Sequence, residues 1–432
     1  MIAANLVLFG LFVVLLLVGT PIGVALGLSA VAAIAVGLDA ASLNMIGTNA
    51  YAGIAKYPLI AIPLFVLTGM IFERSGVAAR LVTLGMAIVG PRRGGLAVVA
   101  ILVCMLMGGM SGSGPADAAA VATVMVPSMM KVGYPRAFSA SVIAAAASTA
   151  ILIPPSIALI IYSILVPGAD LRALFAAGLM PGLLAGIALM APSILLSRRH
   201  GFGIGEGHVR PPLLKSLIDA VPGLLAPAII LGGLRSGLFT PTEAAVVAVF
   251  YGLIVGVFFY RTLGWREIYA ALADSAVTSA VILIILSLAG LFAWAGSTLG
   301  AFDAAARLIL ALSDNSMVIM LAIMAALLLA GMVLDGVSIY LITLPLLMPI
   351  VAAFEWNITW FGVLMAMNIA IGQFTPPMAV NLMVTSSIAR VPIEATVKWT
   401  LWMVLWMTGA LLLVVFFPGL ALWLPEALGY RT

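Results

Sequence analysis

Charged residues are scarce in this sequence. Lys, Arg, Asp and Glu make up 8% of its 432 residues, whereas 64% are hydrophobic. Soluble domains carry about a quarter charged residues, so 19 basic and 15 acidic side chains cannot cover a water-soluble fold of this length. The composition therefore indicates an all-α polytopic membrane protein in a lipid bilayer. Because a spanning helix needs about 20 apolar residues, the length predicts roughly ten to fourteen hydrophobic segments, some of them half-spans.

Cysteine and histidine are also rare. The single cysteine, Cys104, excludes an intrachain disulfide and a thiolate metal site. Both histidines, His200 and His208, fall in one polar loop, so the apolar segments hold no HExxH or Ser-His-Asp arrangement. No GxxxxGK[ST] phosphate loop occurs either. Without these motifs we expect neither an enzyme nor an organic cofactor. We also expect no nucleic-acid partner, because the net charge of +4 comes from scattered basic residues.

The chain starts with an apolar run of about twenty residues. This run lacks the positively charged region of a signal peptide, because the first basic residue is Lys56. We expect it to form the first transmembrane helix. The most polar stretch, residues 197–215, lies near the midpoint and predicts a cytoplasmic linker, because it is rich in Arg and Lys. Arg92 and Arg93 are expected on the same side.

The two halves repeat at an offset of 222 residues. One ungapped register makes the following pairs: Gly109 with Gly331, Met110 with Met332, Gly114 with Gly336, Pro127 with Pro349, Pro154 with Pro376, and Pro155 with Pro377. Internal repeats with interrupted hydrophobic segments are typical of secondary transporters. We expect these parts: 1–95, scaffold helices of repeat 1; 96–197, transport part of repeat 1; 198–215, linker; 216–314, scaffold helices of repeat 2; 315–432, transport part of repeat 2 with a C-terminal helix.

A double proline interrupts one long uncharged run in each half, within residues 137–169 and 356–389. Proline lacks an N–H and clashes with the carbonyl four residues earlier. The prolines are thus expected to free the carbonyls of Ala150, Ile151, Gly372 and Gln373. Such carbonyls are tolerated at membrane depth only inside protein or beside a cavity, where a sodium ion would satisfy them. The helices are expected to resume at Ser156 and Met378, with N-termini that favour an anion.

A second break faces each double proline. Residues 108–117 (GGMSGSGPAD) and 330–336 (AGMVLDG) place glycines in apolar runs, and Pro115 would free the carbonyl of Ser111. We interpret both segments as tips of re-entrant hairpins. Together with the broken helices, they predict a centre for cation and substrate near the membrane midplane.

Five segments resemble the large membrane subunit of the tripartite ATP-independent periplasmic (TRAP) transporters: SGSGPADAAAV, ILIPPSI, GLFTPTEAAVVAVFYG, GMVLDGVSIYLITLPLLMPI and IGQFTPPMAVNLMV. The resemblance covers essentially the whole chain. It implies an elevator-type symporter of the bacterial inner membrane, driven by a sodium gradient. It also implies a small four-helix membrane subunit and a soluble periplasmic substrate-binding protein as partners. The implied substrates are small organic anions such as dicarboxylates, sialic acid, other sugar acids and keto acids.

The resemblance also implies site residues. The first sodium site corresponds to Gly108, Ser111, Ala150, Ile153 and Pro155, and the second to Gly331, Gly372, Thr375 and Met378. Substrate binding is implied for Ser111, Ser156 and Asp335. Two positions depart from the usual pattern, because many members have serine at Gly108 and glycine at Ala150. The first site therefore lacks one hydroxyl oxygen, and no metal other than sodium is implied.

Several side chains allow two interpretations. Asp117, three residues after Gly114, suits a helix cap as well as a site role, and Thr240 with Glu243 fits a capping box. Asp335 shows no such cap signature and is interpreted as functional, because ionisable groups buried in the membrane are functional by default. Asn368 and Asn381 would reach substrate or bridge helices. The alternative function is a stand-alone sodium- or proton-coupled carboxylate symporter, and a membrane enzyme or channel fits less well.

Overall fold

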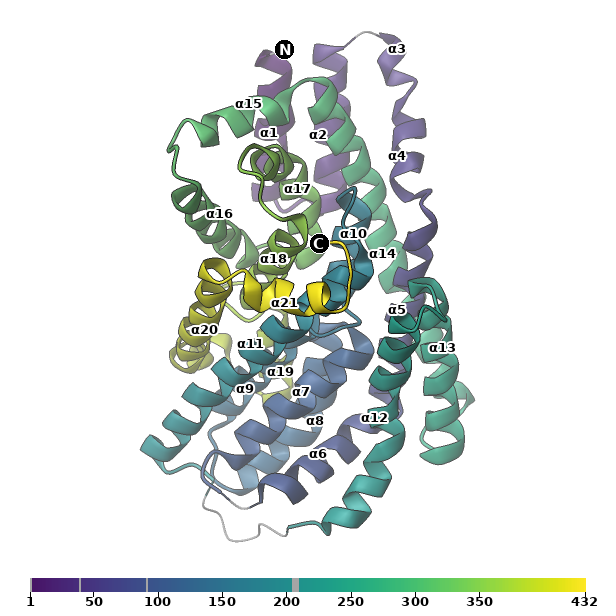
Figure 1. Cartoon of the computed structure of the whole chain (residues 1–432), viewed down its shortest axis with the longest axis vertical. Helices are drawn as coiled ribbons and strands as arrows, with labels where there is room; N and C mark the ends of the chain where they lie inside the picture. The colour runs from purple at the N-terminus through teal and green to yellow at the C-terminus, as the bar shows by residue number, and fades with distance from the viewer. Residues whose placement is uncertain (1, 39, 91, 204–209) are drawn as a thin grey trace.

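The computed structural model describes residues 2–38, 40–90, 92–203 and 210–432, and every regular element in this part of the chain is a helix (Figure 1). The helices before the first hairpin are α1 (Ile2–Leu17), α2 (Ile22–Gly37), α3 (Ala40–Leu43), α4 (Ile46–Ile54), α5 (Ala61–Arg74) and α6 (Val77–Val89). Those before the second hairpin are α12 (Leu213–Arg235), α13 (Pro241–Ile254), α14 (Trp265–Thr298) and α15 (Ala301–Leu310). We call these ten helices the scaffold.

Each half continues with a hairpin and a broken helix. Hairpin 1 is α7 (Gly95–Ser111) and α8 (Gly114–Lys131), and hairpin 2 is α16 (Ser316–Gly331) and α17 (Gly336–Ala353). Broken helix 1 is α9 (Arg136–Ala147), a 3-10 turn (Ser148–Ile151) and α10 (Ile157–Leu165); broken helix 2 is α18 (Ile358–Gly372) and α19 (Val380–Ala389). The remaining helices are α11 (Leu171–His200), α20 (Ile393–Phe416) and α21 (Gly419–Ala427).

The two broken helices run in opposite directions between the two hairpins. α9 packs on α7 and α8 of its own hairpin, whereas α10 packs on α17 of the other one. Likewise α18 packs on α16, whereas α19 packs on α8 and α9. Figure 1 shows α9 and α19 in the lower half of the molecule and α10 and α18 in the upper half. The fold therefore contains two inverted repeats, and the predicted fold class is confirmed.

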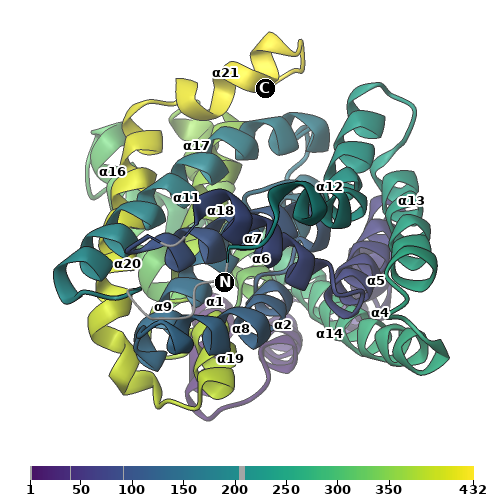
Figure 2. The ribbon, with the colours of Figure 1, turned by 90° about the horizontal axis from the view of Figure 1, so that it is seen from below.

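The scaffold helices of both halves interleave beside this bundle. α14 packs on α2, α4 and α5, and α13 packs on α5 and α12. An ion pair between Arg74 and Asp274 joins α5 to α14. Viewed from below, α4, α5, α13 and α14 stand together on one side, whereas α8, α9 and α19 cluster on the other (Figure 2).

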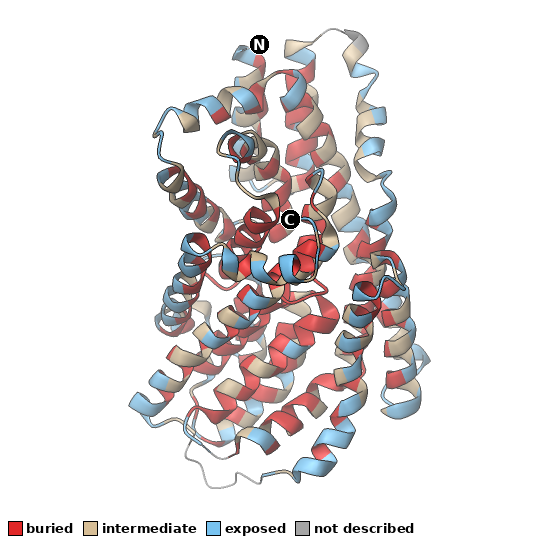
Figure 3. Cartoon of the chain, in the orientation of Figure 1, coloured by how far each residue is buried: buried red, intermediate tan, exposed pale blue. Residues whose placement is uncertain are grey.

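Burial follows the same division (Figure 3). In α18 every residue from Thr359 to Gly372 is buried, as expected for a helix that is apolar all round. In contrast, α14 exposes large apolar side chains such as Val277, Val281 and Ile284, which suit contact with lipid. The hairpins and broken helices thus hold the most completely buried helix, while the core also extends into the scaffold.

Seven helices in the described residues are long and apolar enough to span a membrane, and eight apolar helices are shorter. Together they slightly exceed the ten to fourteen predicted segments, because hairpin tips and breaks divide the apolar runs. The predicted linker is shorter than expected, because α11 continues to His200 and α12 begins at Leu213. Its middle, residues 204–209 with His208, lies outside the described residues. The end of the linker contacts α6, because Arg210 Nε donates to the Ala87 carbonyl at 2.8 Å.

Candidate functional site

The tip of hairpin 1 lies directly against the break in broken helix 1. A Cβ added to Gly108 would lie 2.6 Å from the Ala150 Cα, and one added to Gly112 would lie 2.6 Å from the Pro155 carbonyl oxygen. Gly112 also has a φ of +60°, in the left-handed region that glycine adopts without strain. Only glycine therefore permits this approach of backbone to backbone.

The tip of hairpin 2 makes the equivalent contact with broken helix 2. A Cβ added to Gly372 would lie 2.5 Å from the Gly331 carbonyl oxygen. The Met378 N–H donates to the Met332 carbonyl at 3.1 Å, which joins the restarting chain to the hairpin. The two contacts are related by the sequence repeat, and they bring carbonyl-rich backbone together at two places.

The predicted members of each sodium site gather at these contacts. Next to Gly108 and Ala150 lie Ile153 and Pro155, both within 4 Å of a Cβ built on the glycines of the hairpin 1 tip. Ser111 ends α7 at the same tip. In the second half, Gly331 touches Gly372, and Thr375 follows the same helix end.

The two hydroxyl groups of these sites are oriented suitably for a cation. Ser111 Oγ donates to Asp117 Oδ1 at 2.7 Å and accepts from the Ser113 N–H at 3.1 Å. Thr375 Oγ1 donates to the Ile371 carbonyl at 2.6 Å. Because both protons point to protein acceptors, each oxygen keeps at least one free lone pair. The donor set is therefore chemically compatible with sodium.

The expectation that the double prolines leave open carbonyls is wrong at three of four positions. The Ser156 hydroxyl donates to the Ile151 carbonyl. The Gln373 carbonyl accepts from the Asn381 N–H at 3.0 Å, and the Gly372 carbonyl accepts from the Thr375 N–H at 3.1 Å. Ser156 and Asn381 thus reach back from beyond the double prolines, whereas the Thr375 N–H replaces the lost helical bond from just before one. A carbonyl has two lone pairs, so one bond does not prevent ion binding.

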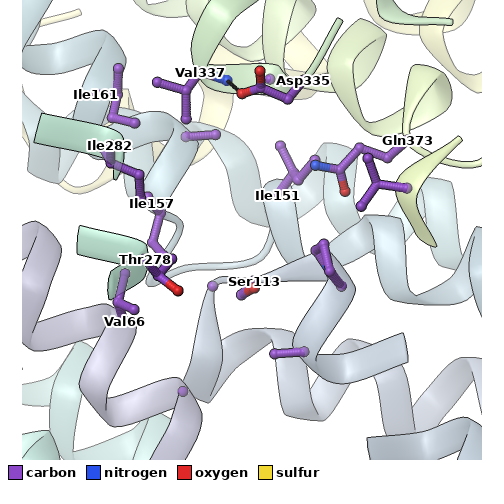
Figure 4. Close-up of a pocket in the computed structure, with 18 of the residues that line it drawn as sticks. Val66, Ser113, Ile151, Ile157, Ile161, Thr278, Ile282, Asp335, Val337 and Gln373 are labelled. Atoms are coloured by element: carbon purple, nitrogen blue, oxygen red, sulfur yellow. Dashed lines mark hydrogen bonds between the residues drawn. The ribbon is translucent and has the colours of Figure 1, made fainter. Parts of the chain in front are cut away.

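A cavity of about 250 Å³ lies between the two hairpin tips (Figure 4). Its walls come from both hairpins and both broken helices, together with α5 and α14 of the scaffold. Most lining groups are apolar, such as Val66, Ile157 and Ile282, and the polar lining side chains are those of Ser113, Thr278, Asp335 and Gln373. This composition matches that of small-molecule sites, in which a few polar groups stand in an apolar wall.

Four helices begin at this cavity. Its lining includes residues from the first turns of α8, α10, α17 and α19. A helix N-terminus exposes backbone N–H groups and carries a partial positive charge of about half a unit. Four such ends around one space favour an anionic ligand.

The three residues expected to bind substrate occupy different positions. Asp335 lines the cavity, but Ser111 and Ser156 are not among its lining residues. Ser156 is fully buried and caps α10 by accepting from the Leu159 N–H at 3.4 Å. Their chain neighbours Gly112 and Ile157 do line the cavity.

The carboxylates next to the two hairpin tips differ from the expectation in which of them caps a helix. Asp335 caps α17, because its Oδ2 accepts from the N–H groups of Val337 at 3.1 Å and Ser338 at 3.3 Å. The interpretation that Asp335 has no cap role is therefore wrong. Asp117 is in the first turn of α8, yet it is fully buried and its side-chain bond in the described residues goes to Ser111. The cap interpretation of Asp117 is not supported.

Thr240, Glu243 and the two asparagines have structural contacts. The Thr240–Glu243 capping box is confirmed, with the Thr240 N–H donating to Glu243 Oε2 at 2.8 Å and the Glu243 N–H donating to Thr240 Oγ1 at 3.3 Å. Asn381 bridges helices, because its Nδ2 donates to the Ala144 carbonyl of α9 at 3.3 Å. Asn368 donates from Nδ2 to the Leu364 carbonyl of its own helix at 3.2 Å and to Met324 Sδ at 2.9 Å.

Sequence reasoning missed three polar side chains of the cavity: those of Ser113, Gln373 and Thr278. Ser113 lies within the predicted hairpin 1 tip, between Ser111 and Pro115. Gln373 stands within the IGQFTPP segment, so its position shortly before the double proline was a usable signal. Thr278 lies in the middle of α14, a helix with no motif, and no local pattern indicates its place in the wall.

Hairpins, broken helices and a central cavity together define a multi-pass membrane carrier built from inverted repeats. The chain matches the family described as "Tripartite ATP-independent periplasmic transporter, DctM component" over residues 9–420. The chain therefore belongs to the large permease subunits of TRAP transporters, and it is a multi-pass protein of the bacterial inner membrane.

Two curated relatives support this assignment. The chain is 36% identical to the isethionate TRAP transporter permease protein DctMQ of Oleidesulfovibrio alaskensis, over 96% of this chain and 65% of that protein. It therefore spans less than two thirds of that relative. It is 36% identical to the C4-dicarboxylate TRAP transporter large permease protein DctM of Pseudomonas aeruginosa, over 86% of this chain and 87% of that protein.

A solved structure shares the fold. The crystal structure of the Alcanivorax borkumensis YdaH transporter superposes with a TM-score of 0.64 at 14% identity, covering 88% of this chain and 90% of that one. At this identity the likeness concerns the fold alone.

Proposed function

We propose that this chain is the permease of a sodium-driven TRAP transporter for a small organic anion, which a soluble periplasmic protein delivers and a small membrane subunit helps to import. The convergence of four helix N-termini on the central cavity carries this proposal. The Asp335 carboxylate already occupies the N-terminus of α17. The positive ends of α8, α10 and α19 remain, and they favour an anion without a buried lysine or arginine. The two curated relatives are named for isethionate and C4-dicarboxylates, which are both small organic anions.

Sodium coupling follows from the charge of the cavity wall. The Asp335 carboxylate lines the same space as the proposed anion, so the two negative charges would repel each other in a medium of low dielectric constant. Bound sodium supplies the positive charge that offsets this repulsion. The Ser111 hydroxyl oxygen has a free lone pair at the first tip contact, and the Thr375 hydroxyl oxygen has one at the second. Both contacts lie beside the cavity.

An elevator movement fits the largely apolar surface between the cavity and the scaffold helices. On the scaffold side the cavity is bordered by Val66 and Met70 of α5 and by Thr278 and Ile282 of α14. We infer that the hairpins and broken helices slide as one body past these helices. Side chains without strong polar contacts make little resistance to sliding, because few hydrogen bonds must break.

Thermal stability of the purified chain tests sodium binding without knowledge of the substrate. A ligand at a hundred times its dissociation constant stabilises the folded state by about 2.7 kcal/mol. We expect a saturable sodium-specific rise in melting temperature, with potassium and choline holding the ionic strength constant. The rise should shrink in Ser111→Ala and Thr375→Ala, because each substitution removes one side-chain oxygen.

Reconstitution then tests the whole proposal. Vesicles that contain the chain, its small subunit and the binding protein should take up an organic anion only under an inward sodium gradient. Uptake by the chain alone would instead support a stand-alone symporter. Unchanged sodium stabilisation in both variants would count against the two sites, and the absence of any sodium effect would favour proton coupling.

A further inference from the structure

Three buried oxygen atoms near the start of α8 are not accounted for by the two sodium sites. Asp117 Oδ2, Gln373 Oε1 and Asn381 Oδ1 are buried and accept no hydrogen bond from any described residue. Asp117 and Asn381 have no exposed surface at all. A buried acceptor without a donor costs about 1–3 kcal/mol, so three in one region point to a missing partner.

Two of the three oxygens lie beside Gly114, and the third belongs to Asp117 on the same helix. A Cβ added at this glycine would lie 2.5 Å from Gln373 Oε1, 2.9 Å from Asn381 Nδ2 and 3.0 Å from Asn381 Oδ1, so both amides occupy the space beside it. Asp117 follows three residues later on α8. Residues at this spacing are neighbours on one helix face, and their side chains lean toward the helix N-terminus. The Asp117 carboxylate therefore lies on the Gly114 side of the helix.

Hydrogen bonds hold the three groups in this arrangement. The Asn381 Nδ2 donates to the Ala144 carbonyl at 3.3 Å, which holds the side-chain amide in its place beside Gly114. The Asn381 N–H donates to the Gln373 carbonyl at 3.0 Å and keeps these two residues together across the double proline. Asp117 Oδ1 accepts from Ser111 Oγ at 2.7 Å, which leaves Oδ2 available. The side chains of Asp117 and Asn381 are thus held by partners outside the cluster.

The charge of Asp117 limits which ligand could satisfy the three unpaired oxygens. The ion pairs in the described residues, Arg74–Asp274 and Arg172–Asp170, do not include it. A proton on Asp117 would supply one O–H donor for two amide oxygens, so at least one of them would stay unpaired. A water molecule has two hydrogens for three acceptors and no charge to offset a buried carboxylate. A monovalent cation meets both needs, because carboxylate and carbonyl oxygens are hard ligands suited to hard cations.

We propose that Asp117, Gln373 and Asn381 bind an additional sodium ion between α8 and α19. The site rests on the sodium coupling proposed above, but it differs from the two tip sites in its ligands. Asp117 belongs to hairpin 1, whereas Gln373 and Asn381 belong to broken helix 2, so the ion joins the two repeats. Gly114 and Gln373 also line the central cavity. Occupancy of this site is thereby linked to the loading of the cavity.

Equilibrium binding of radioactive sodium to the purified full-length chain tests this site. We expect Asn381→Leu to bind one sodium ion fewer per chain than the wild type, because the substitution removes Oδ1. It keeps the number of side-chain heavy atoms but also removes the Nδ2 bond to the Ala144 carbonyl. The matched control is Thr385→Val, four residues further along α19. Thr385 is also buried, but its hydroxyl donates to the Leu382 carbonyl of its own helix at 3.2 Å. The control should bind the wild-type number of ions.

A second variant keeps the test decisive if Asn381→Leu does not fold. Asp117→Asn should melt at a higher temperature than the wild type in choline, because it removes an uncompensated buried charge. It should also gain less stability from sodium. Equal sodium binding by the wild type, Asn381→Leu and Asp117→Asn would overturn the additional site alone. No sodium binding by the wild type would overturn sodium coupling as a whole.

Discussion

Gly372→Ala tests the contact between hairpin 2 and broken helix 2. The new Cβ would lie 2.5 Å from the Gly331 carbonyl oxygen and 2.7 Å from the Gly331 Cα, whereas ordinary contact begins at 3.4 Å. Backbone atoms cannot rotate away as a side chain does, so the hairpin tip must move by about 0.9 Å. Overpacking of this kind typically costs 1–3 kcal/mol. We expect a lower melting temperature in choline and a loss of most sodium-specific stabilisation.

Two further glycines provide a graded comparison. A Cβ at Gly331 would lie 3.2 Å from the Gly372 Cα, so Gly331→Ala should cost less than Gly372→Ala. Gly409, within α20, has no atom within 4 Å of its Cβ position. Gly409→Ala should therefore stabilise the chain by roughly 0.5–1 kcal/mol through helix propensity alone. Melting curves with and without sodium measure all three, and a Gly372→Ala variant that behaves like Gly409→Ala would refute the close contact.

Two other substitutions separate folding from transport. Tyr162→Phe removes the hydroxyl that donates to the Ile358 carbonyl at 2.7 Å between α10 and α18, and thermal melts should show a loss of about 1 kcal/mol. Asp335→Asn should keep the melting temperature, because asparagine caps helices about as well as aspartate. Uptake by this variant in reconstituted vesicles should depend less on sodium than uptake by the wild type, because the repulsion that sodium offsets is gone. An unchanged sodium dependence would show that the charge of Asp335 has no part in coupling.

The breaks in the helices were predicted accurately, because their cause is local. Broken helix 1 resumes at Ile157 with Ser156 as its cap, one residue from the expected position. Broken helix 2 resumes at Val380, two residues after Met378. The missing proline N–H and the clash of its ring act within four residues. The positions of the breaks therefore follow from the sequence without knowledge of the fold.

The fate of the freed carbonyls was not predictable in the same way. Ser156 and Asn381 satisfy them from five and eight residues further along the chain. Whether such a residue turns back depends on the packing of the segment against the opposite hairpin. Asp335 and Asp117 illustrate the difference between a role that the sequence reveals and a role that depends on the fold. The Asp335 cap was readable from its position directly before a helix start, whereas the Asp117 bond to Ser111 required the folded hairpin.

Composition, the repeat and the placement of proline and glycine determined by themselves that this chain is a membrane carrier with two broken helices and two hairpins. These features follow from covalent geometry and from the cost of unpaired backbone groups in lipid. Only the tertiary structure decided that α5 and α14 border the cavity, that four helix N-termini meet there, and that Gln373 and Asn381 lie beside Gly114. Those contacts join residues that are distant in the sequence, and they depend on side-chain packing, which no local pattern specifies.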